Sequence, residues 1–201
     1  MDGLSWPVTL TEGPVGLRPL QMRDARAWQL VRARNAAWLT PWEATPPQGS
    51  GLTQPLGFSQ LVRRYRRQAR EGVALPWVIT YEGRLAGQLT IANIVWASAR
   101  MGSAGYWVDE AVAGRGVVPT ALAMAVDHCF GAAGMHRIEV NIRPENTASL
   151  RVVEKLGFRD EGVRERFLHI DRQWRDHRSF ALTVEDVPDG LLNRWRRTQH
   201  R

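Results

Sequence analysis

The chain has 201 residues, of which 44% are hydrophobic and 23% are charged, and its formal net charge is +7 at pH 7. This length and apolar content suffice for one well-buried core, and no Pro/Ser/Gly-rich linker divides the sequence, so we expect a single domain over residues 1–201. No charged-then-apolar leader opens the sequence, and no apolar run approaches the roughly 20 residues that span a bilayer. These features predict a soluble, cytoplasmic protein without a membrane partner.

The chain contains a single cysteine, Cys129. One thiol excludes an intrachain disulfide and a cysteine-rich metal site, and we expect no metal. Cys129 lies within an apolar helical pattern, which predicts a buried thiol without a chemical role.

The positive charge permits contact with an anionic partner, because net charge steers encounters. The densest cationic stretch is LVRRYRRQAR at residues 61–70, where arginines surround an apolar seam of Leu61, Val62, Tyr65 and Ala69. Such a pattern is typical of a solvated amphipathic helix. No recognised nucleic-acid module accompanies it, so the charge permits nucleic-acid contact but the sequence does not indicate it.

The N-terminal third has the pattern strand, helix, loop and helix. Residues 15–20 form a β-type run, and Asp24 is placed to cap a helix that ends near Asn35. Prolines and glycines make residues 39–55 a loop. Ser59 is then placed to cap the arginine-rich helix.

The rest of the chain alternates between β-rich runs and helical periodicity. Two hairpins are marked by short polar turns, at residues 82–84 and 171–173. We expect strands at residues 77–81, 85–96, 103–108, 137–143, 163–170 and 174–184, and helices at 117–130, 146–157 and 190–197.

Residues 105–131 (GYWVDEAVAGRGVVPTALAMAVDHCFG) carry the most informative pattern. A β-type run is followed by a tight turn from Gly114 to Gly116 and by a helix with Pro119 in its first turn, where proline fits. A helix start leaves backbone N–H groups unpaired at the positive end of the helix dipole, and two glycines let that backbone close around an anion. The pattern therefore predicts a phosphate or pyrophosphate site.

Three kinds of site share this arrangement. A Walker loop needs Lys followed by Ser or Thr after the last glycine, but Val117 and Val118 follow here, which disfavours a nucleoside triphosphate. A dinucleotide fold expects a third glycine or alanine where Pro119 stands, although Glu139 on the next strand mimics its ribose-binding acid. The third is the acyl-CoA loop of the GCN5-related N-acetyltransferases (GNAT), which this turn resembles. A plain structural turn would also use two glycines.

A second stretch, residues 137–158 (RIEVNIRPENTASLRVVEKLGF), resembles the last sequence block of the same family. Its strand alternates apolar and polar residues. Asn146 can cap the following helix, with Ser149 three positions on, and Gly157 ends that helix. Two linked signatures in the expected order identify the chain as a member of the GNAT family.

The resemblance implies an α/β fold built as a single GNAT domain. Such a domain has a mixed, mostly antiparallel central sheet of about seven strands with helices on both faces. Two neighbouring parallel strands, here residues 103–108 and 137–143, splay apart and hold acyl-CoA in the gap. The GYW strand, the sequence from Pro144 to Ser149 and residues 174–177 look most like the branch that acetylates protein N-termini, including those of ribosomal proteins.

The resemblance also implies how acetyl-CoA is held. Main-chain N–H groups near Trp107 or Val108 would polarise the thioester carbonyl, and Asn146 would contact CoA or cap its helix. Ala111 stands where the family usually has Gln or Arg, which predicts a weaker phosphate contact and leaves open an acyl-CoA-binding module without turnover. The pyrophosphate would be bound by the backbone N–H groups of Gly114, Arg115, Gly116 and Val117. The side chain of Arg115 would add positive charge.

Acetyl transfer requires removal of the amine proton, stabilisation of an oxyanion and a donor for the departing thiolate. Ser149 is our candidate donor, because Val153 stands where many relatives have a tyrosine; alternatively, Ser149 only bonds backbone at a helix start. Glu139 is the first candidate for the base and His169 the second. Glu139 could instead pair with an arginine, and His169 could be a surface residue. Family members also let water act in place of a base.

We expect the acceptor to be the N-terminal α-amine of a protein, such as a ribosomal protein. In this interpretation Trp42, Glu43, Tyr106 and Trp174 contact the substrate, although Trp42 could instead only anchor its loop on the core. The alternative acceptors are small-molecule amines, namely an aminoglycoside, a polyamine or an amino acid. The sequence is compatible with both a monomer and a homodimer.

Overall fold

The structure, a computed structural model, describes residues 6–47 and 56–199. The second half of the predicted loop, residues 48–55, lies outside the described residues. In the described part the strands are β1 (Leu10–Glu12), β2 (Val15–Pro19), β3 (Leu75–Tyr81), β4 (Arg84–Val95), β5 (Met101–Val108), β6 (Arg137–Ile142), β7 (Arg159–Ile170) and β8 (Gln173–Thr183). The helices are α1 (Ala25–Arg34), α2 (Ala36–Leu39), α3 (Phe58–Arg70), α4 (Val117–Phe130), α5 (Thr147–Leu156) and α6 (Leu191–Gln199).

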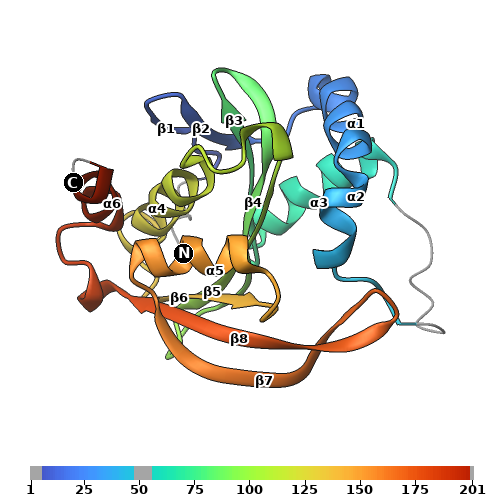
Figure 1. The fold of residues 1–201 in the computed structure, drawn as a ribbon. Helices are drawn as coiled ribbons and strands as arrows, with labels where there is room; N and C mark the ends of the chain where they lie inside the picture. Colours follow the sequence, from blue (N-terminus) through green and yellow to red (C-terminus); the bar gives the residue numbers. More distant parts are fainter. Residues whose placement is uncertain (1–5, 48–55, 200–201) are drawn as a thin grey trace.

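The strands form one sheet in the order β1-β2-β3-β4-β5-β6-β8-β7 (Figure 1). Strands β5 and β6 run parallel, and the other neighbouring pairs are antiparallel. The predicted α/β fold with a mixed, mostly antiparallel sheet is confirmed, with eight strands rather than about seven. The additional strand is β1, which pairs with β2 across the turn at Gly13. Its three residues are too few to show an alternating pattern in the sequence.

Helices cover both faces of the sheet. α4, α5 and α6 lie on one face, and α1 and α3 lie on the other (Figure 1). The larger core cluster fills the first side, and a smaller one of Leu20, Val31, Val62, Val78 and Leu85 lies beneath α1 and α3. α4 is buried along nearly its whole length because it packs between the sheet and α6. The indole N–H of Trp195 on α6 donates to the hydroxyl of Thr120 on α4 at 2.8 Å.

The ends of α1 and α5 agree with the sequence, with Asp24 as the N-cap and Asn35 as the C-cap of α1, whereas the start of α3 differs. Asn146 caps α5, where its side chain accepts from the Ser149 N–H at 3.1 Å, and Gly157 ends that helix with a φ of 74°. Ser59 does not cap α3, because the helix already begins at Phe58 and Gly57 is its N-cap. The Asp24 carboxylate accepts from the Gln21 N–H at 2.8 Å, one short 3-10 turn before α1.

The predicted loop after Asn35 is more regular than expected. The short helix α2 follows α1 directly, and a 3-10 turn, Thr40–Trp42, follows α2. Pro41 lies at the start of that turn, where proline is tolerated. A proline in this stretch is therefore compatible with a helical turn as well as with the predicted loop. Among the helices that the structure describes, none is long and apolar enough to cross a membrane.

Candidate functional site

β5 and β6 separate partway along their length. They pair from Met101 with Arg137 to Ala104 with Val140. Beyond this point, β5 remains paired with β4 as far as Val108, and β6 remains paired with β8 as far as Ile142. The two parallel strands therefore diverge after Ala104, and each leaves part of its main-chain edge without the other strand.

The register of β4 and β5 decides which groups of β5 face this gap. Asp109 donates its N–H to Ala86, the residue directly opposite, at 2.7 Å. In an antiparallel pair, hydrogen-bonded positions alternate with positions whose polar groups point away from the partner strand. Tyr106 and Val108 therefore turn their N–H and C=O groups towards the gap. The Val108 carbonyl accepts there from the Trp38 indole at 3.2 Å.

Of the two expected positions for the N–H that polarises the thioester, Trp107 and Val108, the strand register disfavours Trp107. Its main chain is at a position bonded to Gln88 on β4. Its side chain lies on the α1 side of the sheet, with its ring 5.5 Å from the ring of Trp28 and beneath the Arg32 guanidinium. Alternation along the strand leaves the Val108 N–H as the candidate donor.

The glycine turn has the geometry of an anion site. Gly114 and Gly116 have φ values of 79° and 76°, and α4 begins directly after Gly116. These left-handed conformations favour glycine. A Cβ at Gly114 would meet no atom within 4 Å, so the turn is open on its outer side. With the unpaired first amides of α4, this backbone fits a pyrophosphate. Arg115 is exposed, as is Ala111, where the family usually has a longer side chain.

Tyr106 and Ser149 meet beside the divergence. The Tyr106 hydroxyl is buried and has no hydrogen-bond partner among the described residues. Burial raises the pKa of this phenol, and the neighbouring Ser149 side chain acts in the opposite direction without outweighing burial. The phenol therefore stays protonated at neutral pH. Because the main-chain N–H of Ser149 makes the α5 cap, its hydroxyl is not needed for that cap. Two hydroxyl donors thus lie side by side.

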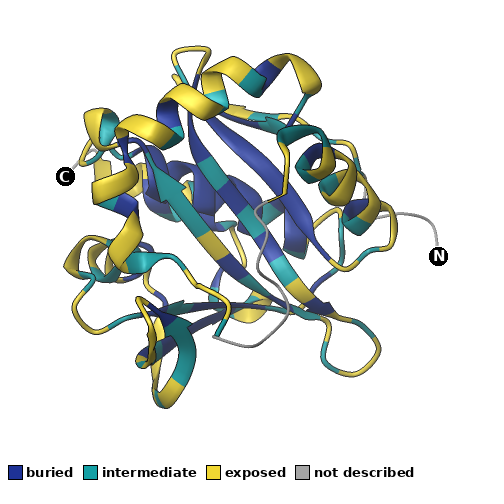
Figure 2. Ribbon diagram, turned by 90° about the vertical axis from the view of Figure 1, so that its right-hand side faces the viewer, coloured by how far each residue is buried: buried dark blue, intermediate teal, exposed yellow. Residues whose placement is uncertain are grey.

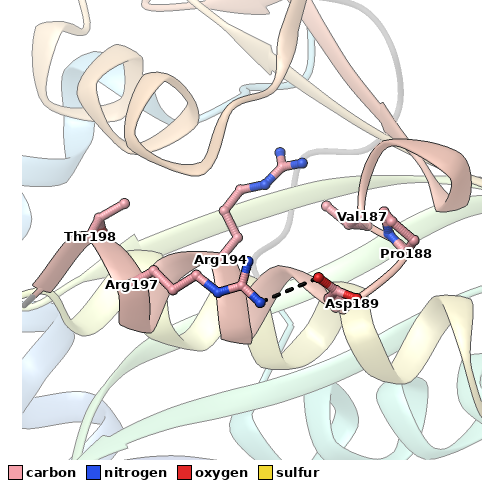
Figure 3. Close-up of a pocket in the computed structure, with 7 residues that line it drawn as sticks. Val187, Pro188, Asp189, Arg194, Arg197 and Thr198 are labelled. Atoms are coloured by element: carbon pink, nitrogen blue, oxygen red, sulfur yellow. Dashed lines mark hydrogen bonds and ion pairs between the residues drawn. The ribbon is translucent and has the colours of Figure 1, made fainter.

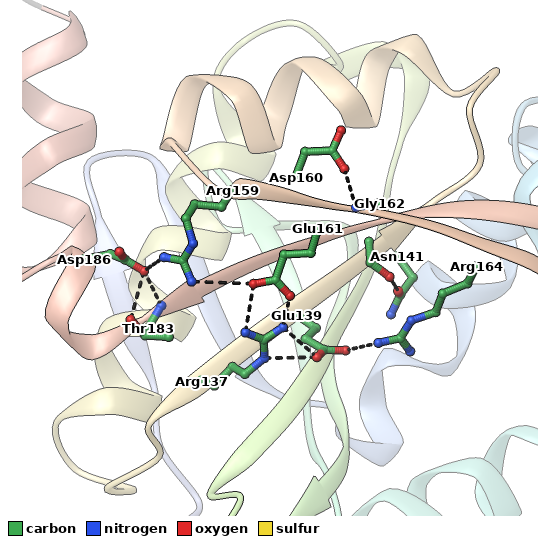
Figure 4. A network of polar contacts seen from close by, with 11 residues as sticks. Arg137, Glu139, Asn141, Arg159, Asp160, Glu161, Gly162, Arg164, Thr183 and Asp186 are labelled. Carbon is green, nitrogen blue, oxygen red and sulfur yellow. Dashed lines mark hydrogen bonds and ion pairs between the residues drawn. The ribbon is translucent and has the colours of Figure 1, made fainter.

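Glu139, the first candidate base, is held in an ion-pair network (Figure 4). It is 5% exposed, and its Oε1 accepts from Arg137 at 2.9 and 3.0 Å while its Oε2 accepts from Arg164 at 2.8 Å. The residue of β5 that is in register with Glu139 is Ser103, which lies before the two strands diverge. Both oxygens are thus committed to guanidinium groups, which favours the ion-pair alternative over the catalytic one.

His169, the second candidate base, joins two segments. Its Nδ1 lies 3.0 Å from the Thr45 carbonyl oxygen and 2.9 Å from the Thr45 hydroxyl, and Thr45 donates its N–H to the His169 carbonyl at 2.8 Å. Ala44 also forms a β-bridge with Ile170. The structure does not bring His169 together with Ser149. It uses the histidine to attach residues 44–45 to the tip of the β7–β8 hairpin.

The predicted substrate residues Trp42, Glu43 and Trp174 surround this junction. The Arg143 guanidinium lies 5.4 Å from the centre of the Trp42 ring, and Glu43 pairs with Arg32 of α1. Trp174 is 55% exposed, with its ring edge-on to His169 at 5.7 Å. The fourth predicted substrate residue, Tyr106, lies apart from these three, beside Ser149.

Sequence reasoning missed a buried polar cluster at the end of β5. Asp109, 3% exposed, accepts from Asn35 at 2.9 Å and from Arg34, while Asn35 accepts from the Glu110 N–H at 2.9 Å. Burial acts to raise the pKa of Asp109, but the hydrogen bonds from Arg34 and Asn35 outweigh it and hold the pKa below its usual value. The cluster fixes the C-terminal end of α1 to the chain that leads into the glycine turn. In the sequence, Asn35 signalled only the end of a helix.

His177 on β8 was likewise not singled out as a site residue. It is 3% exposed, its Nδ1 lies 3.0 Å from the Arg175 carbonyl oxygen, and its ring is edge-on to Phe167. Burial lowers the pKa of this imidazole, so the ring is neutral at neutral pH. Its fixed ring supports the β7–β8 hairpin from within.

A separate pocket of about 290 Å³ lies at the start of α6 (Figure 3). Two of its lining residues are already engaged, because Arg194 donates to the carbonyl oxygens of Leu156 and Asp186 while Arg197 pairs with Asp189. The gap between β5 and β6 contributes no residue to it. We therefore place the chemistry at the gap and not in this pocket.

The family model of the acetyltransferase (GNAT) domain matches residues 15–159. The chain belongs to the GNAT acetyltransferase family. It is 40% identical to Mycobacterium smegmatis RimJ, whose structure is a complex with CoA-disulfide, with a TM-score of 0.90 over 96% of each chain. It is 30% identical to the [ribosomal protein uS5]-alanine N-acetyltransferase of Escherichia coli, over 91% of this chain and 94% of that protein. The probable N-acetyltransferase YjcK of Bacillus subtilis is 33% identical over 52% of this chain and 58% of that protein.

This GNAT chain is therefore an acyltransferase whose acyl donor is acetyl-CoA. The residues fit that donor: the open glycine turn and the first amides of α4 suit its pyrophosphate, and the diverging edge of β5 offers free main-chain groups. Among residues 6–47 and 56–199, no group of three or more His, Cys, Asp or Glu side chains is placed to hold a metal ion.

Cys129→Ala is expected to leave turnover near the wild-type rate. The thiol is fully buried in α4, and burial raises its pKa to about 12, so almost no thiolate is present at neutral pH. A thiolate is the nucleophilic form of cysteine, so transfer should proceed directly to the amine. Acetyl-CoA consumption by both proteins, with a mass spectrum of the enzyme quenched during turnover, tests this. An acetylated Cys129, or a large loss of rate, would contradict direct transfer.

Proposed function

We propose that this GNAT enzyme, acting in the cytoplasm as one domain, acetylates the N-terminal α-amine of a protein, and that the protein is ribosomal. Its similarity to M. smegmatis RimJ and to the E. coli uS5-alanine enzyme supports this substrate class. The observation that carries the proposed chemistry is the pair of hydroxyl donors, Tyr106 and Ser149, beside the point where β5 and β6 diverge.

The proposed chemistry assigns a task to each group at the gap. The Val108 N–H stabilises the carbonyl oxygen as negative charge develops on it. The amine nitrogen forms its bond to the acetyl carbon, the carbon–sulfur bond breaks, and the amine proton goes to water. The Tyr106–Ser149 pair gives one proton to the departing sulfur and regains it from solvent, so protons balance. We assign the base role to water because Glu139 and His169 are engaged elsewhere.

The proposed acceptor side is the opposite face of the sheet from α4 and α5. Residues 42–45 and the tip of the β7–β8 hairpin meet there through the Ala44–Ile170 bridge. Trp42 and Trp174 offer aromatic surface at this junction, and Glu43 lies beside them. A peptide N-terminus that approaches from this side would place its first residue in the most confined position.

A small first residue, alanine or serine, is expected to be acetylated fastest in peptides that differ only at position one. The reason is geometric, because the amine must come within roughly 3 to 3.5 Å of the acetyl carbon and a bulky side chain beside it hinders that approach. The measurement is the initial rate with acetyl-CoA, read by mass, for matched peptides that also contain one lysine as a competing amine.

Three outcomes would contradict the proposal. Preferential modification of the lysine would reject N-terminal specificity. Faster acetylation of a polyamine or an aminoglycoside than of every peptide would favour a small-molecule acceptor. Tight CoA binding without turnover on any amine would favour a binding module, the alternative that Ala111 left open.

A further inference from the structure

Six arginines without a carboxylate partner lie together on one side of the molecule. No carboxylate of the described residues lies within 4.0 Å of six arginines on α1, α3 and the short turn before α1, namely Arg23, Arg26, Arg63, Arg64, Arg66 and Arg70. By contrast, ion pairs neutralise most arginines of β6, β7 and α6. The α1–α3 side of the sheet therefore carries a compact group of arginines without carboxylate partners, whereas other such arginines, among them Arg84, Arg100 and Arg172, are dispersed.

α3 contributes the densest part of this charge. It carries five arginines and no acidic residue, and no Asp or Glu occurs between Glu43 and Glu71. At about 100° per residue, Arg63, Arg64 and Arg67 fall on the half of the helix opposite the buried Val62 and Ala69, and Arg66 and Arg70 lie along one flank of it. We name this surface the α3 arginine face: Arg63, Arg64, Arg66, Arg67 and Arg70. All five residues are exposed, and Figure 2 views the molecule from this side.

Helix stability does not explain this composition. Like charges three and four positions apart, such as Arg63, Arg66 and Arg67, repel each other and destabilise a helix by a few tenths of a kcal/mol per pair. A helix selected only for solubility would interleave acidic residues. The one pairing present, Arg67 with Glu71 at 3.8 Å, joins two exposed side chains and contributes little. Packing of the buried face stabilises the helix, and the exposed arginines are available to bind an anion.

We propose that the α3 arginine face docks on the phosphate backbone of RNA. Guanidinium groups bind phosphate oxygens in pairs of hydrogen bonds, and an array of them without apolar residues between suits a repeating phosphate chain. The choice of RNA over an acidic protein rests on the proposed function, because a ribosomal substrate is presented amid RNA. The contact positions the enzyme and reads no base sequence.

The fold connects this face to the acceptor side. The Trp28 ring of α1 lies 6.3 Å from the Phe58 ring at the start of α3, which packs the two helices together. α1 continues through α2 to residues 42–45, which meet the β7–β8 hairpin. RNA docked on α3 would therefore lie on the same side of the sheet as the junction proposed to receive the N-terminus.

The test is binding of a fluorescein-labelled RNA hairpin to the full chain, measured by anisotropy over a range of salt concentrations. The logarithm of the wild-type binding constant should fall with the logarithm of the salt concentration with a slope of about −3.5 to −4.5, as expected for five phosphate contacts. The variant Arg63→Glu/Arg66→Glu/Arg70→Glu should bind at least about tenfold more weakly, with a shallower slope. The same three positions changed to Gln give a milder variant should the Glu protein fail to fold.

The matched control is Arg84→Glu/Arg100→Glu/Arg172→Glu. These arginines are exposed and without an ion pair among the described residues, but they are dispersed: Arg84 begins β4, Arg100 precedes β5 and Arg172 lies in the β7–β8 turn. The control removes the same net charge and should keep most of the RNA affinity. Acetylation of a free peptide should be unchanged in the α3 variant, so this assay reports on the proposed function separately from docking.

Two results would overturn the inference. Equal loss of RNA affinity in the α3 variant and the control would show that net charge, and not this face, attracts RNA. If the α3 variant bound a polyglutamate peptide more weakly than the wild type but bound RNA equally well, the partner would be an acidic protein instead.

Discussion

Gly116→Glu is expected to abolish CoA binding while the fold remains. Gly116 is the N-cap of α4, and its φ of 76° lies in the left-handed region, where a side chain costs about 1–2 kcal/mol. A carboxylate would also stand beside the amides proposed to bind the pyrophosphate and repel it. We expect the CoA dissociation constant, measured by calorimetry, to rise more than about a hundredfold, which is the loss of about 3 kcal/mol.

Gly83→Glu provides the matched control. Gly83 lies in the β3–β4 turn with a φ of 75°, and a Cβ there would meet no atom within 4 Å. This substitution introduces the same charge and the same backbone strain away from the gap. It should therefore lower the thermal midpoint about as much as Gly116→Glu without changing CoA affinity. Unchanged CoA affinity in the folded Gly116→Glu protein would reject the assignment of the turn.

Ser149→Ala and Tyr106→Phe are each expected to lower kcat by about a hundredfold, the lower range for loss of a positioned proton donor. Tyr106→Phe keeps the ring that packs against the core and removes only the buried hydroxyl. Ser149→Ala keeps the α5 cap, because Asn146 accepts from the main-chain N–H of residue 149. CoA affinity and thermal stability should change little in either variant. The kcat values come from peptide acetylation at saturating acetyl-CoA.

The double variant tests whether the two hydroxyls act as a unit. If they share one proton, the double variant should be little slower than either single variant, because removing the second donor from a coupled pair costs little more. Fully additive losses would indicate two independent roles. Wild-type kcat in both single variants would remove the pair from the mechanism and leave proton donation to solvent.

Local sequence patterns determined the family, the glycine turn and the ends of α5. Each depends on residues close together in the chain: two glycines before an apolar helix, an amide side chain three positions before the N–H that it caps, and a glycine at the left-handed end. The burial of Cys129 followed from the same helical period. These features could be predicted because their physical causes act within one turn or one strand.

Only the tertiary structure decided which groups form the candidate site. Whether Trp107 or Val108 faces the gap depends on the register between β4 and β5, and a shift of one residue would exchange them. The guanidinium groups that hold Glu139 come partly from a strand 25 residues away, and the partner of Asn35 lies 74 residues away. Such pairings depend on how separate strands and helices meet in space, so no pattern of neighbouring residues predicts them.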